Sequence, residues 1–355
     1  MTAGGPVNVA DIERLVAGKL VADQHDYFAG GAADERTLRD NVEAWARRKL
    51  LPRVMVDVGE VTTATTVLGT DVSVPVLVAP VALQGMAHAD GERAMARAAA
   101  AAGTIMCVST LANARPSEIA AAAPGGARWY QLYVLRDRGV THALVDEAID
   151  SGVEALVLTV DAPIAGQRER DVRSGFAVPH GLEMPGVSAA LGRTAGGLTP
   201  QEYFGLVDKT LTWRDFEVLA QESDVPVLVK GVHSPVDARL AVEHGAAGVI
   251  VSNHGGRQLD NVPAGIDLLE PVVQEIGGEV EVLVDGGVRR GTDVLVALAL
   301  GARAVLVGRP ALWGLAWNGE AGARWILETL REEIRVALTL LGAPSPAAVT
   351  RAHVV

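Results

Sequence analysis

The chain has 355 residues, 49% of them hydrophobic, with 31 basic and 43 acidic side chains and a formal net charge of -12. This content suffices for one large globular domain or two smaller ones, and the charge argues against nucleic acid or an anionic membrane as partner. The lone Cys107 lies in an apolar stretch and cannot form an internal disulfide, which is typical of a reducing cytoplasm. Because the start shows no secretion signal and no apolar stretch reaches membrane-spanning length, we expect a cytoplasmic protein.

Eight short apolar runs follow residues 1–75, which are expected to form helices and a small hairpin around Gly69-Thr70-Asp71. The runs are residues 76–79, 105–109, 129–133, 155–160, 227–230, 249–252, 282–285 and 304–308. Helical stretches separate them, and spacings of about 20 to 35 residues are those of a strand, a loop and a covering helix. Eight such units predict an α/β fold, a parallel (β/α)8 TIM barrel.

One gap, between residues 160 and 227, is far longer than the others and rich in glycine and proline. We therefore expect residues 172–211 to form a mobile lid over the barrel mouth and not a second domain. Residues 320–341 are expected to form a closing helix. The chain, 1–355, is predicted as a single barrel domain with an N-terminal extension and a lid after the fourth strand.

Polar side chains stand where the predicted strands end, which is where the chemistry of TIM barrels gathers. They are Ser109, Gln131, Tyr133, Thr159, Asp161, Lys230, His254, Arg257, Asp285 and Arg309. Any one of these polar residues could equally well only cap a loop by hydrogen bonding, but polar residues at the ends of so many strands favour an active site. Lys230 would stabilise an anion on a cofactor ring. The alternative role for Lys230 is an ion pair with Asp161 or Asp285 at the rim of the barrel.

The most informative segment in the chain is Val249-Ile250-Val251-Ser252-Asn253-His254-Gly255-Gly256-Arg257-Gln258-Leu259-Asp260. An apolar strand stops there at a sharp turn, which brings a base and a guanidinium together. Arg257 suits a carboxylate, which it can bind through two parallel hydrogen bonds, while His254 suits proton removal from the neighbouring carbon or hydroxyl. A histidine satisfied by hydrogen bonds within the turn is the alternative.

Glycines and arginines follow the last two predicted strands, in Asp285-Gly286-Gly287-Val288-Arg289-Arg290 and Gly308-Arg309-Pro310. This pattern is the usual phosphate pocket of a TIM barrel, so a phosphorylated ligand is predicted. No P-loop and no dinucleotide fingerprint follows a first strand, which disfavours ATP and nicotinamide cofactors. No metal site is predicted.

With these motifs the chain resembles the FMN-dependent 2-hydroxy acid oxidases and dehydrogenases, which include glycolate oxidase, lactate oxidase, mandelate dehydrogenase and hydroxymandelate oxidase. The resemblance covers the chain from about Asp26 onward and rests also on Tyr27-Phe28-Ala29-Gly30-Gly31-Ala32, Gln131-Leu132-Tyr133, Thr159-Val160-Asp161 and Lys230-Gly231-Val232. It implies oxidation of an (S)-2-hydroxy acid to a 2-oxo acid with FMN as cofactor.

The resemblance also implies a role for each site residue. His254, oriented by Asp161, would take the hydroxyl proton as hydride passes to the flavin, although a carbanion route is also argued for the family. Tyr133 would bind the hydroxyl or developing carbonyl oxygen, and Lys230 would stabilise the reduced flavin. The substrate carboxylate would be held by Arg257, Arg168 and Tyr27. The flavin would be held by Ala82, Ser109, Gln131, Thr159, Lys230 and Ser252 at its ring and ribityl chain, and by Asp285, Gly287, Arg289, Gly308 and Arg309 at its phosphate end.

Two features depart from known patterns of the family. Leu111 stands where glycolate oxidases carry a tryptophan, which indicates a bulkier or aromatic substrate unless the leucine only repacks. The lid lacks the membrane-binding insert of the membrane-bound dehydrogenases, so a soluble protein is expected. We expect an oxidase that gives hydrogen peroxide from dioxygen, with a dehydrogenase using a quinone or protein acceptor as the alternative.

An FMN barrel that only isomerises would leave the pairing of His254 with Arg257 unexplained. The resemblance also implies a homo-oligomer, as a tetramer.

Overall fold

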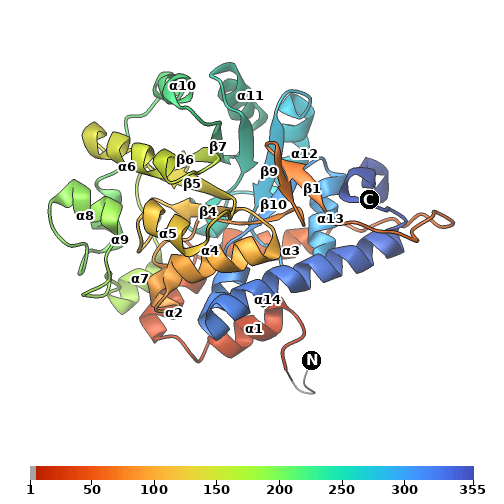
Figure 1. The fold of residues 1–355 in the computed structure, drawn as a ribbon, viewed down its shortest axis with the longest axis horizontal. Coiled ribbons are helices and arrows are strands. Elements are labelled where there is room, and N and C mark those ends of the chain that lie inside the picture. Colours follow the sequence, from red (N-terminus) through yellow and green to blue (C-terminus); the bar gives the residue numbers. More distant parts are fainter. Residues whose placement is uncertain (1–4) are drawn as a thin grey trace.

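The computed structural model describes residues 5–355, so the first four residues of the expected N-terminal extension lie outside the described part. Its centre is a closed barrel of eight parallel strands in the order β10-β3-β4-β5-β6-β7-β8-β9 (Figure 1). The strands are β3 (Val76–Val78), β4 (Met106–Ser109), β5 (Arg128–Leu132), β6 (Ala155–Thr159), β7 (Val227–Val232), β8 (Gly248–Val251), β9 (Glu281–Asp285) and β10 (Ala304–Val307). Each predicted run overlaps one barrel strand, with ends that differ by one or two residues, so the predicted fold class is confirmed.

In the described residues a helix follows each barrel strand and covers the outside of the barrel. These helices are α4 (Gly91–Ala102), α5 (Pro116–Ala122), α6 (Arg138–Asp150), α10 (Trp213–Glu222), α11 (Pro235–Glu243), α12 (Gly265–Ile276), α13 (Gly291–Ala299) and α14 (Arg309–Leu341). The predicted closing helix, 320–341, is the second part of α14. Non-helical backbone at Asn318 and Gly319 interrupts α14, which separates its first part from the periodic pattern of the second.

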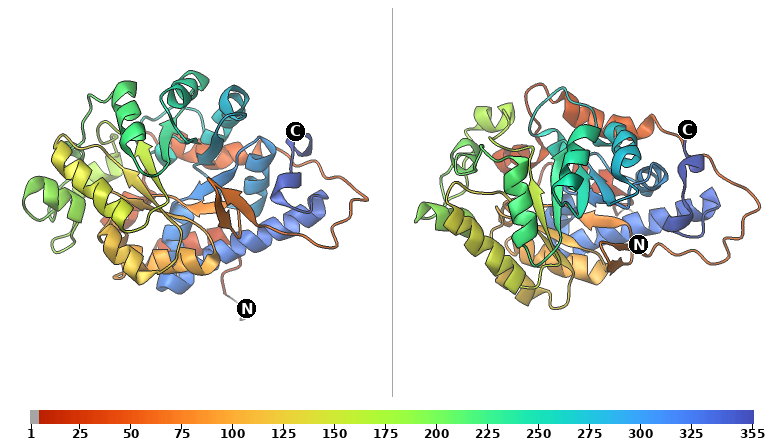
Figure 2. Two further views of the ribbon diagram at one scale, coloured as in Figure 1. Left: turned by 45° about the horizontal axis from the view of Figure 1, so that its top comes forward. Right: turned by 90° about the horizontal axis from the view of Figure 1, so that it is seen from above.

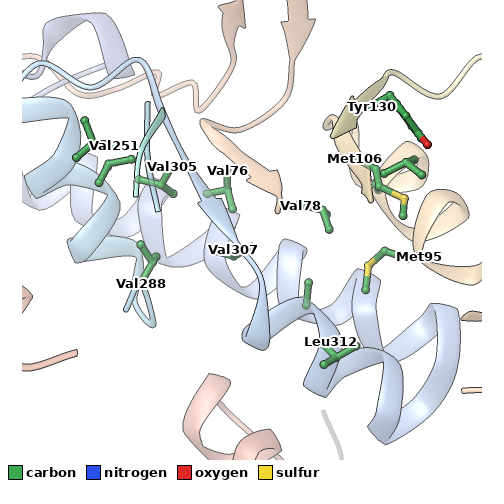
Figure 3. Packing of buried hydrophobic residues seen from close by; sticks show 14 of the residues in the cluster. Val76, Val78, Met95, Met106, Tyr130, Val251, Val288, Val305, Val307 and Leu312 are labelled. Carbon is green, nitrogen blue, oxygen red and sulfur yellow. The ribbon is translucent and has the colours of Figure 1, made fainter. Parts of the chain in front are cut away.

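Side chains alternate between the two faces of each strand, as the two-residue period of a strand requires. Figure 3 shows part of the outer layer, in which Val76, Val78 and Met106 belong to the cluster between strands and helices. The intervening residues, among them Leu77 and Cys107, point into the barrel and form a second buried cluster. The barrel interior is therefore packed, with Cys107 as a buried core thiol.

The N-terminal extension contains the expected helices and hairpin, namely α1 (Val9–Val16), α2 (Ala22–Ala29), α3 (Arg36–Ala46), β1 (Thr65–Val67) and β2 (Thr70–Val72). Val67 and Val72 of the hairpin belong to the interior cluster. The hairpin also bonds to the amino ends of two strands. Glu281, the first residue of β9, accepts from the Leu68 backbone N–H at 2.8 Å, and Glu154, just before β6, accepts from Thr70 Oγ1 at 2.6 Å. The hairpin therefore closes the amino end of the barrel and leaves the carboxyl end for the site.

The long connection after β6 carries three short helices, α7 (Glu169–Ser174), α8 (Pro185–Leu191) and α9 (Pro200–Phe204). Gly175 and Gly192 end two of them with left-handed backbone, as is common for glycine after a helix. These helices lie on the opposite side of the molecule from residues 54–61 in both views of Figure 2. Among the described residues no helix is both long and apolar enough to cross a bilayer.

The remaining elements are short 3-10 turns. They are η1 (Gln84–Met86), η2 (His254–Gly256), η3 (Pro346–Ala348) and η4 (Arg351–His353).

Candidate active site

A cavity at the carboxyl end of the barrel gathers the polar residues predicted at the strand ends. The same alternation that points Cys107 and Trp129 inward also points Ser109 and Gln131 inward, two positions further along. Thr159, Lys230 and Asp285 follow Val157, Leu228 and Leu283 in the same way. The polar layer is therefore the uppermost layer of the barrel interior.

Almost all predicted site residues line this one cavity. They are Tyr27, Ala82, Ser109, Leu111, Gln131, Tyr133, Thr159, Arg168, Lys230, His254, Arg257, Asp285, Gly287, Arg289, Gly308 and Arg309. Asp161 and Ser252 are buried behind the wall, where Asp161 is bonded to His254 and Ser252 to Lys230. These two would therefore act through the residues that they contact.

The turn that carries His254 has an uncommon backbone. His254, Gly255 and Gly256 have φ values of 58°, 64° and 74°, a region that is strained for a residue with a side chain. Ser252 Oγ accepts from the His254 backbone N–H at 3.0 Å and so braces the turn. A Cβ on Gly256 would lie 2.6 Å from the backbone nitrogen of Leu38, so only glycine allows this approach of α3.

Asp161 orients the imidazole ring of His254. The two side chains meet at 2.9 Å between Nδ1 and Oδ1, which assigns the proton to Nδ1 and leaves Nε2 as an acceptor. Burial lowers the pKa of His254 despite the opposing effect of Asp161, so the ring is neutral at neutral pH. Burial would raise the pKa of Asp161, but its interaction with His254, which includes the hydrogen bond, and the charge of Lys230 outweigh burial and lower that pKa. The pair therefore combines a free base with an ionised carboxylate.

Two buried guanidinium groups face the cavity near this base. Arg168 lies between two rings, with its guanidinium carbon 5.8 Å from the centre of Tyr27 and 5.9 Å from that of Phe204. Within the described residues its buried Nη1 has no hydrogen-bond partner, and Asp171 lies 3.7 Å away. Burial and the charge of Arg168 lower the pKa of Arg257 to about 10, which leaves Arg257 charged at neutral pH. Such a pair favours an anion with several acceptor oxygens.

Lys230 forms an ion pair with Asp285 at the rim of the barrel, which was the alternative role expected for it. Its Nζ lies 3.0 Å from Asp285 Oδ2 and donates to Ser252 Oγ at 2.8 Å. Burial works to lower the pKa of Lys230, but Asp285 and Asp161 outweigh it and hold that pKa above its ordinary value. Because Lys230 also lines the cavity, it presents a fixed positive charge there.

Two buried polar atoms in the barrel, Gln131 Nε2 and Asp285 Oδ1, indicate which hydrogen-bonding groups a bound ring would have to offer. Gln131 Oε1 accepts from Ser109 Oγ at 3.1 Å and from the Thr110 backbone N–H at 3.3 Å, so its Nε2 is the free donor. In the described part of the chain this Nε2 and Asp285 Oδ1 are buried without partners. Unpartnered buried donors and acceptors are costly, so a polar ring that offers both complements them. The isoalloxazine ring of FMN has such a polar edge.

The opposite end of the cavity has the glycine and arginine residues expected for a phosphate. At Gly287, φ is 86° and a Cβ would lie 1.7 Å from the backbone oxygen of Asn41, so a side chain is excluded there. Arg289 lines this end together with Gly308, which precedes the N-terminus of α14. The residues present therefore fit FMN at both ends of the cavity.

Arg309 has a structural function that sequence reasoning did not show. It donates to the backbone oxygens of Phe28 at 2.9 Å, Gly255 at 3.0 Å and Gly30 at 3.0 Å, which ties the extension to the His254 turn. Burial and nearby arginines lower its pKa to about 9. Its predicted contact with the ribityl-phosphate end stays a prediction.

Sequence reasoning missed Phe204, whose ring lines the cavity from the end of the lid. It packs edge-on against Tyr133 with ring centres 5.4 Å apart. A signal was present: Thr199 and Glu202 form a capping box, which predicts a short helix ending in the aromatic pair Tyr203 and Phe204.

The barrel, its base–carboxylate pair and its cation-lined cavity define a flavin-dependent oxidoreductase of hydroxy acids. The model of the family "FMN-dependent dehydrogenase" matches residues 17–355. Glycolate oxidase 3 of Arabidopsis thaliana is 46% identical, with 98% of this chain and 95% of the relative covered. An L-lactate oxidase of Nostoc sp. is 45% identical, with 96% of each covered. A crystal structure of mandelate oxidase with (S)-4-hydroxymandelic acid matches with a TM-score of 0.91 and 43% identity over 97% of each chain.

The chain therefore belongs to the FMN-dependent 2-hydroxy acid oxidase family. It is an FMN-dependent enzyme that acts on CH–OH groups.

Proposed function

We propose that the protein oxidises an (S)-2-hydroxy acid larger than glycolate to the 2-oxo acid, with dioxygen as electron acceptor and hydrogen peroxide as product. The observation that carries this proposal is the pair of buried arginines, one with an unpartnered donor, beside the His254–Asp161 pair. A 2-hydroxy acid bears a carboxylate and a hydroxyl on adjacent carbons. One such ligand would meet both the arginines and the base.

Each polar side chain has a separate task in the proposed reaction. Arg168 and Arg257 bind the carboxylate and fix the position of the reacting carbon. His254 Nε2 accepts the hydroxyl proton, and Asp161 stabilises the resulting imidazolium. FMN, when bound, would supply the acceptor for the hydrogen of the reacting carbon together with its two electrons, that is, for a hydride. Lys230 keeps a positive charge beside the cavity and so favours the negative charge that develops there.

Tyr133 would donate a hydrogen bond to the substrate hydroxyl or the developing carbonyl oxygen. Burial raises the pKa of Tyr133 above its ordinary value, so its hydroxyl stays protonated and remains a donor. The tyrosine therefore holds the reacting oxygen without competing with His254 for the proton.

The apolar wall of the cavity supports a substrate larger than glycolate. Leu111 is 5% exposed and lines the cavity together with the rings of Phe204 and Tyr133. Glycolate has no side chain to contact such a wall, whereas an aliphatic or aromatic side chain gains from burial there. The mandelate oxidase structure with (S)-4-hydroxymandelic acid, 43% identical, supports an aromatic substrate.

Dioxygen as acceptor is supported by the relatives, which are named glycolate oxidase and L-lactate oxidase. The alternative is a dehydrogenase of the same family that uses a quinone or protein acceptor. We also propose a cytoplasmic location, on the ground that the lone Cys107 is a buried thiol.

An oxygen electrode with coupled product analysis tests the proposal. With (S)-mandelate or (S)-lactate we expect oxygen uptake, hydrogen peroxide and 2-oxo acid in equal amounts. Rapid turnover with an artificial dye or quinone but slow uptake of oxygen would assign a dehydrogenase instead.

A further inference from the structure

A buried carboxylate, Asp171 of α7, adjoins the two arginines that are proposed to bind the substrate carboxylate. Helix α7 lies beside α2 (Figure 1). Asp171 is 4% exposed, and within the described residues neither of its side-chain oxygens has a hydrogen-bond partner. A buried carboxylate without such partners is costly, so its presence beside the arginines indicates a function.

Asp171 acts on the arginines by its charge and not by a hydrogen bond. Its Oδ2 lies 3.7 Å from Arg168 Nη1, which is beyond hydrogen-bond distance. Arg168 is held instead between the rings of Tyr27 and Phe204. Arg257 is held by the backbone, since its Nη1 donates to the Tyr27 backbone oxygen at 2.6 Å. Removal of the Asp171 charge would therefore leave both guanidinium groups in position.

The three charged groups influence one another's ionisation. Burial raises the pKa of Asp171, and the charges of Arg257 and Arg168 oppose that rise. Burial and the charge of Arg168 lower the pKa of Arg257 to about 10, and the charge of Asp171 opposes that decrease. Because Asp171 cancels part of the positive charge of the arginine pair, it weakens the attraction of the pair for a bound anion.

We propose that Asp171 limits how tightly the arginine pair holds a carboxylate and so favours release of the 2-oxo acid product. Since the arginine pair is taken as the carboxylate site, the proposal rests on the proposed function. Asp171 lies behind the cavity wall that Arg168 and Arg257 line, so it acts on the ligand through its field and not by contact. Substrate and product bear the same carboxylate, and without Asp171 both would be held more tightly.

Binding of two anions of nearly the same shape tests the proposal. Oxamate carries one negative charge at neutral pH and oxalate carries two, and neither has a CH–OH group that could be oxidised. Asp171→Asn keeps the size of the side chain and removes its charge. Isothermal titration calorimetry of the FMN-bound protein measures Kd for both anions. The control is Glu169→Gln, because Glu169 lies on the same helix, is partly exposed and forms an ion pair with Arg173.

Asp171→Asn should bind oxamate about tenfold more tightly than the wild type does, because one repulsion inside the protein is removed. Oxalate should gain by about the square of that factor, since each of its two charges loses the same repulsion. Pyruvate, a 2-oxo acid with one charge, should gain as oxamate does. Glu169→Gln should change each Kd little, as is usual for an exposed charge. Retained FMN absorbance shows that each variant is folded.

Unchanged or weaker binding of both anions by Asp171→Asn would overturn the proposal, because a purely structural role can only weaken binding. An equal gain for oxamate and oxalate would also overturn it, since an effect of charge has to grow with the charge of the ligand. Asp171→Ser, which is uncharged and smaller, should show the same gains, and loss of FMN in both variants would assign Asp171 to folding instead. A wild type that binds neither anion would overturn the proposed carboxylate site as well.

Discussion

His254 depends for its position on its neighbours, because the left-handed backbone of its turn is held by contacts and not by the preference of the residue. Ser252, Asp161 and the close approach of Leu38 each contribute one contact. Lys230, one strand away, shares the Ser252 hydroxyl. The base and the fixed cation are thus coupled through a single side chain.

Replacing His254 with glutamine should abolish most proton transfer and leave FMN bound. Glutamine keeps a polar side chain of similar size but is not a base, and loss of general-base catalysis typically costs about 10²–10⁴-fold. Anaerobic stopped-flow measurement of flavin reduction checks this, with His180→Gln, an exposed histidine in the lid, as control. A rate within about tenfold of wild type would mean that His254 is not the base.

Replacing Arg257 with lysine should weaken substrate binding strongly and leave FMN in place. Lysine keeps the charge but loses the planar fork, including the Nη1 donor to the Tyr27 backbone oxygen at 2.6 Å. Anaerobic titration with substrate measures the change in Kd, and Arg193→Lys in the lid is the control. An unchanged Kd would show that Arg257 does not contact the carboxylate.

Replacing Leu111 with tryptophan should shift preference from mandelate towards glycolate. The larger ring would fill space that a substrate side chain needs, and pocket contacts of this kind discriminate by about 1–3 kcal/mol. The ratio of kcat/KM for the two substrates is the readout, with Leu111→Met as a control of similar volume. If kcat/KM falls by the same factor for both substrates, Leu111 does not set the size of the pocket.

Helix α3 braces the active-site turn, which makes the N-terminal extension part of the site. The side chains of Asn41 and Asn253 exchange hydrogen bonds of 2.9 and 2.8 Å, and Asn253 Oδ1 also accepts from the Gly256 backbone N–H at 3.1 Å. The brace therefore links α3 directly to the residue pair that follows His254.

Asn41→Leu should lower both stability and activity. It keeps the size of the side chain but leaves the buried amide of Asn253 partly unsatisfied, which costs about 1–3 kcal/mol. Urea unfolding of the FMN-bound protein and the rate of flavin reduction measure the two effects, with the exposed Glu43→Gln on the same helix as control. A variant as stable and as fast as wild type would show that Asn41 of α3 does not support the active-site turn.

The elements that the sequence predicted are those with a simple period. Each barrel strand is a short apolar run, and its two-residue alternation carries the polar residues to the cavity. The helices of the lid were not predicted, since each is only five to seven residues long and glycines interrupt the pattern. Single-sequence patterns also do not show that Arg309 binds backbone oxygens far away in the chain.

At the scale of the whole molecule, the site is assembled from both ends of the chain. Tyr27 from the extension and Arg309 at the start of the last helix line one cavity, and β10 pairs with β3 to close the barrel between them. The mobility of the lid, the single-domain organisation and the roles of the site residues stay predictions. The cavity is lined by residues from both ends of the chain, so its formation depends on the pairing of β10 with β3 that closes the barrel.

The measurement that tests the account most directly is anaerobic mixing of the FMN-bound protein with glycolate, (S)-lactate, (S)-mandelate and a long-chain 2-hydroxy acid. Loss of the visible absorbance of oxidised flavin reports reduction. We expect bleaching by 2-hydroxy acids, faster with (S)-mandelate than with glycolate, and almost none in His254→Gln. Flavin that stays oxidised with every 2-hydroxy acid, or that bleaches equally fast without His254, would contradict this expectation.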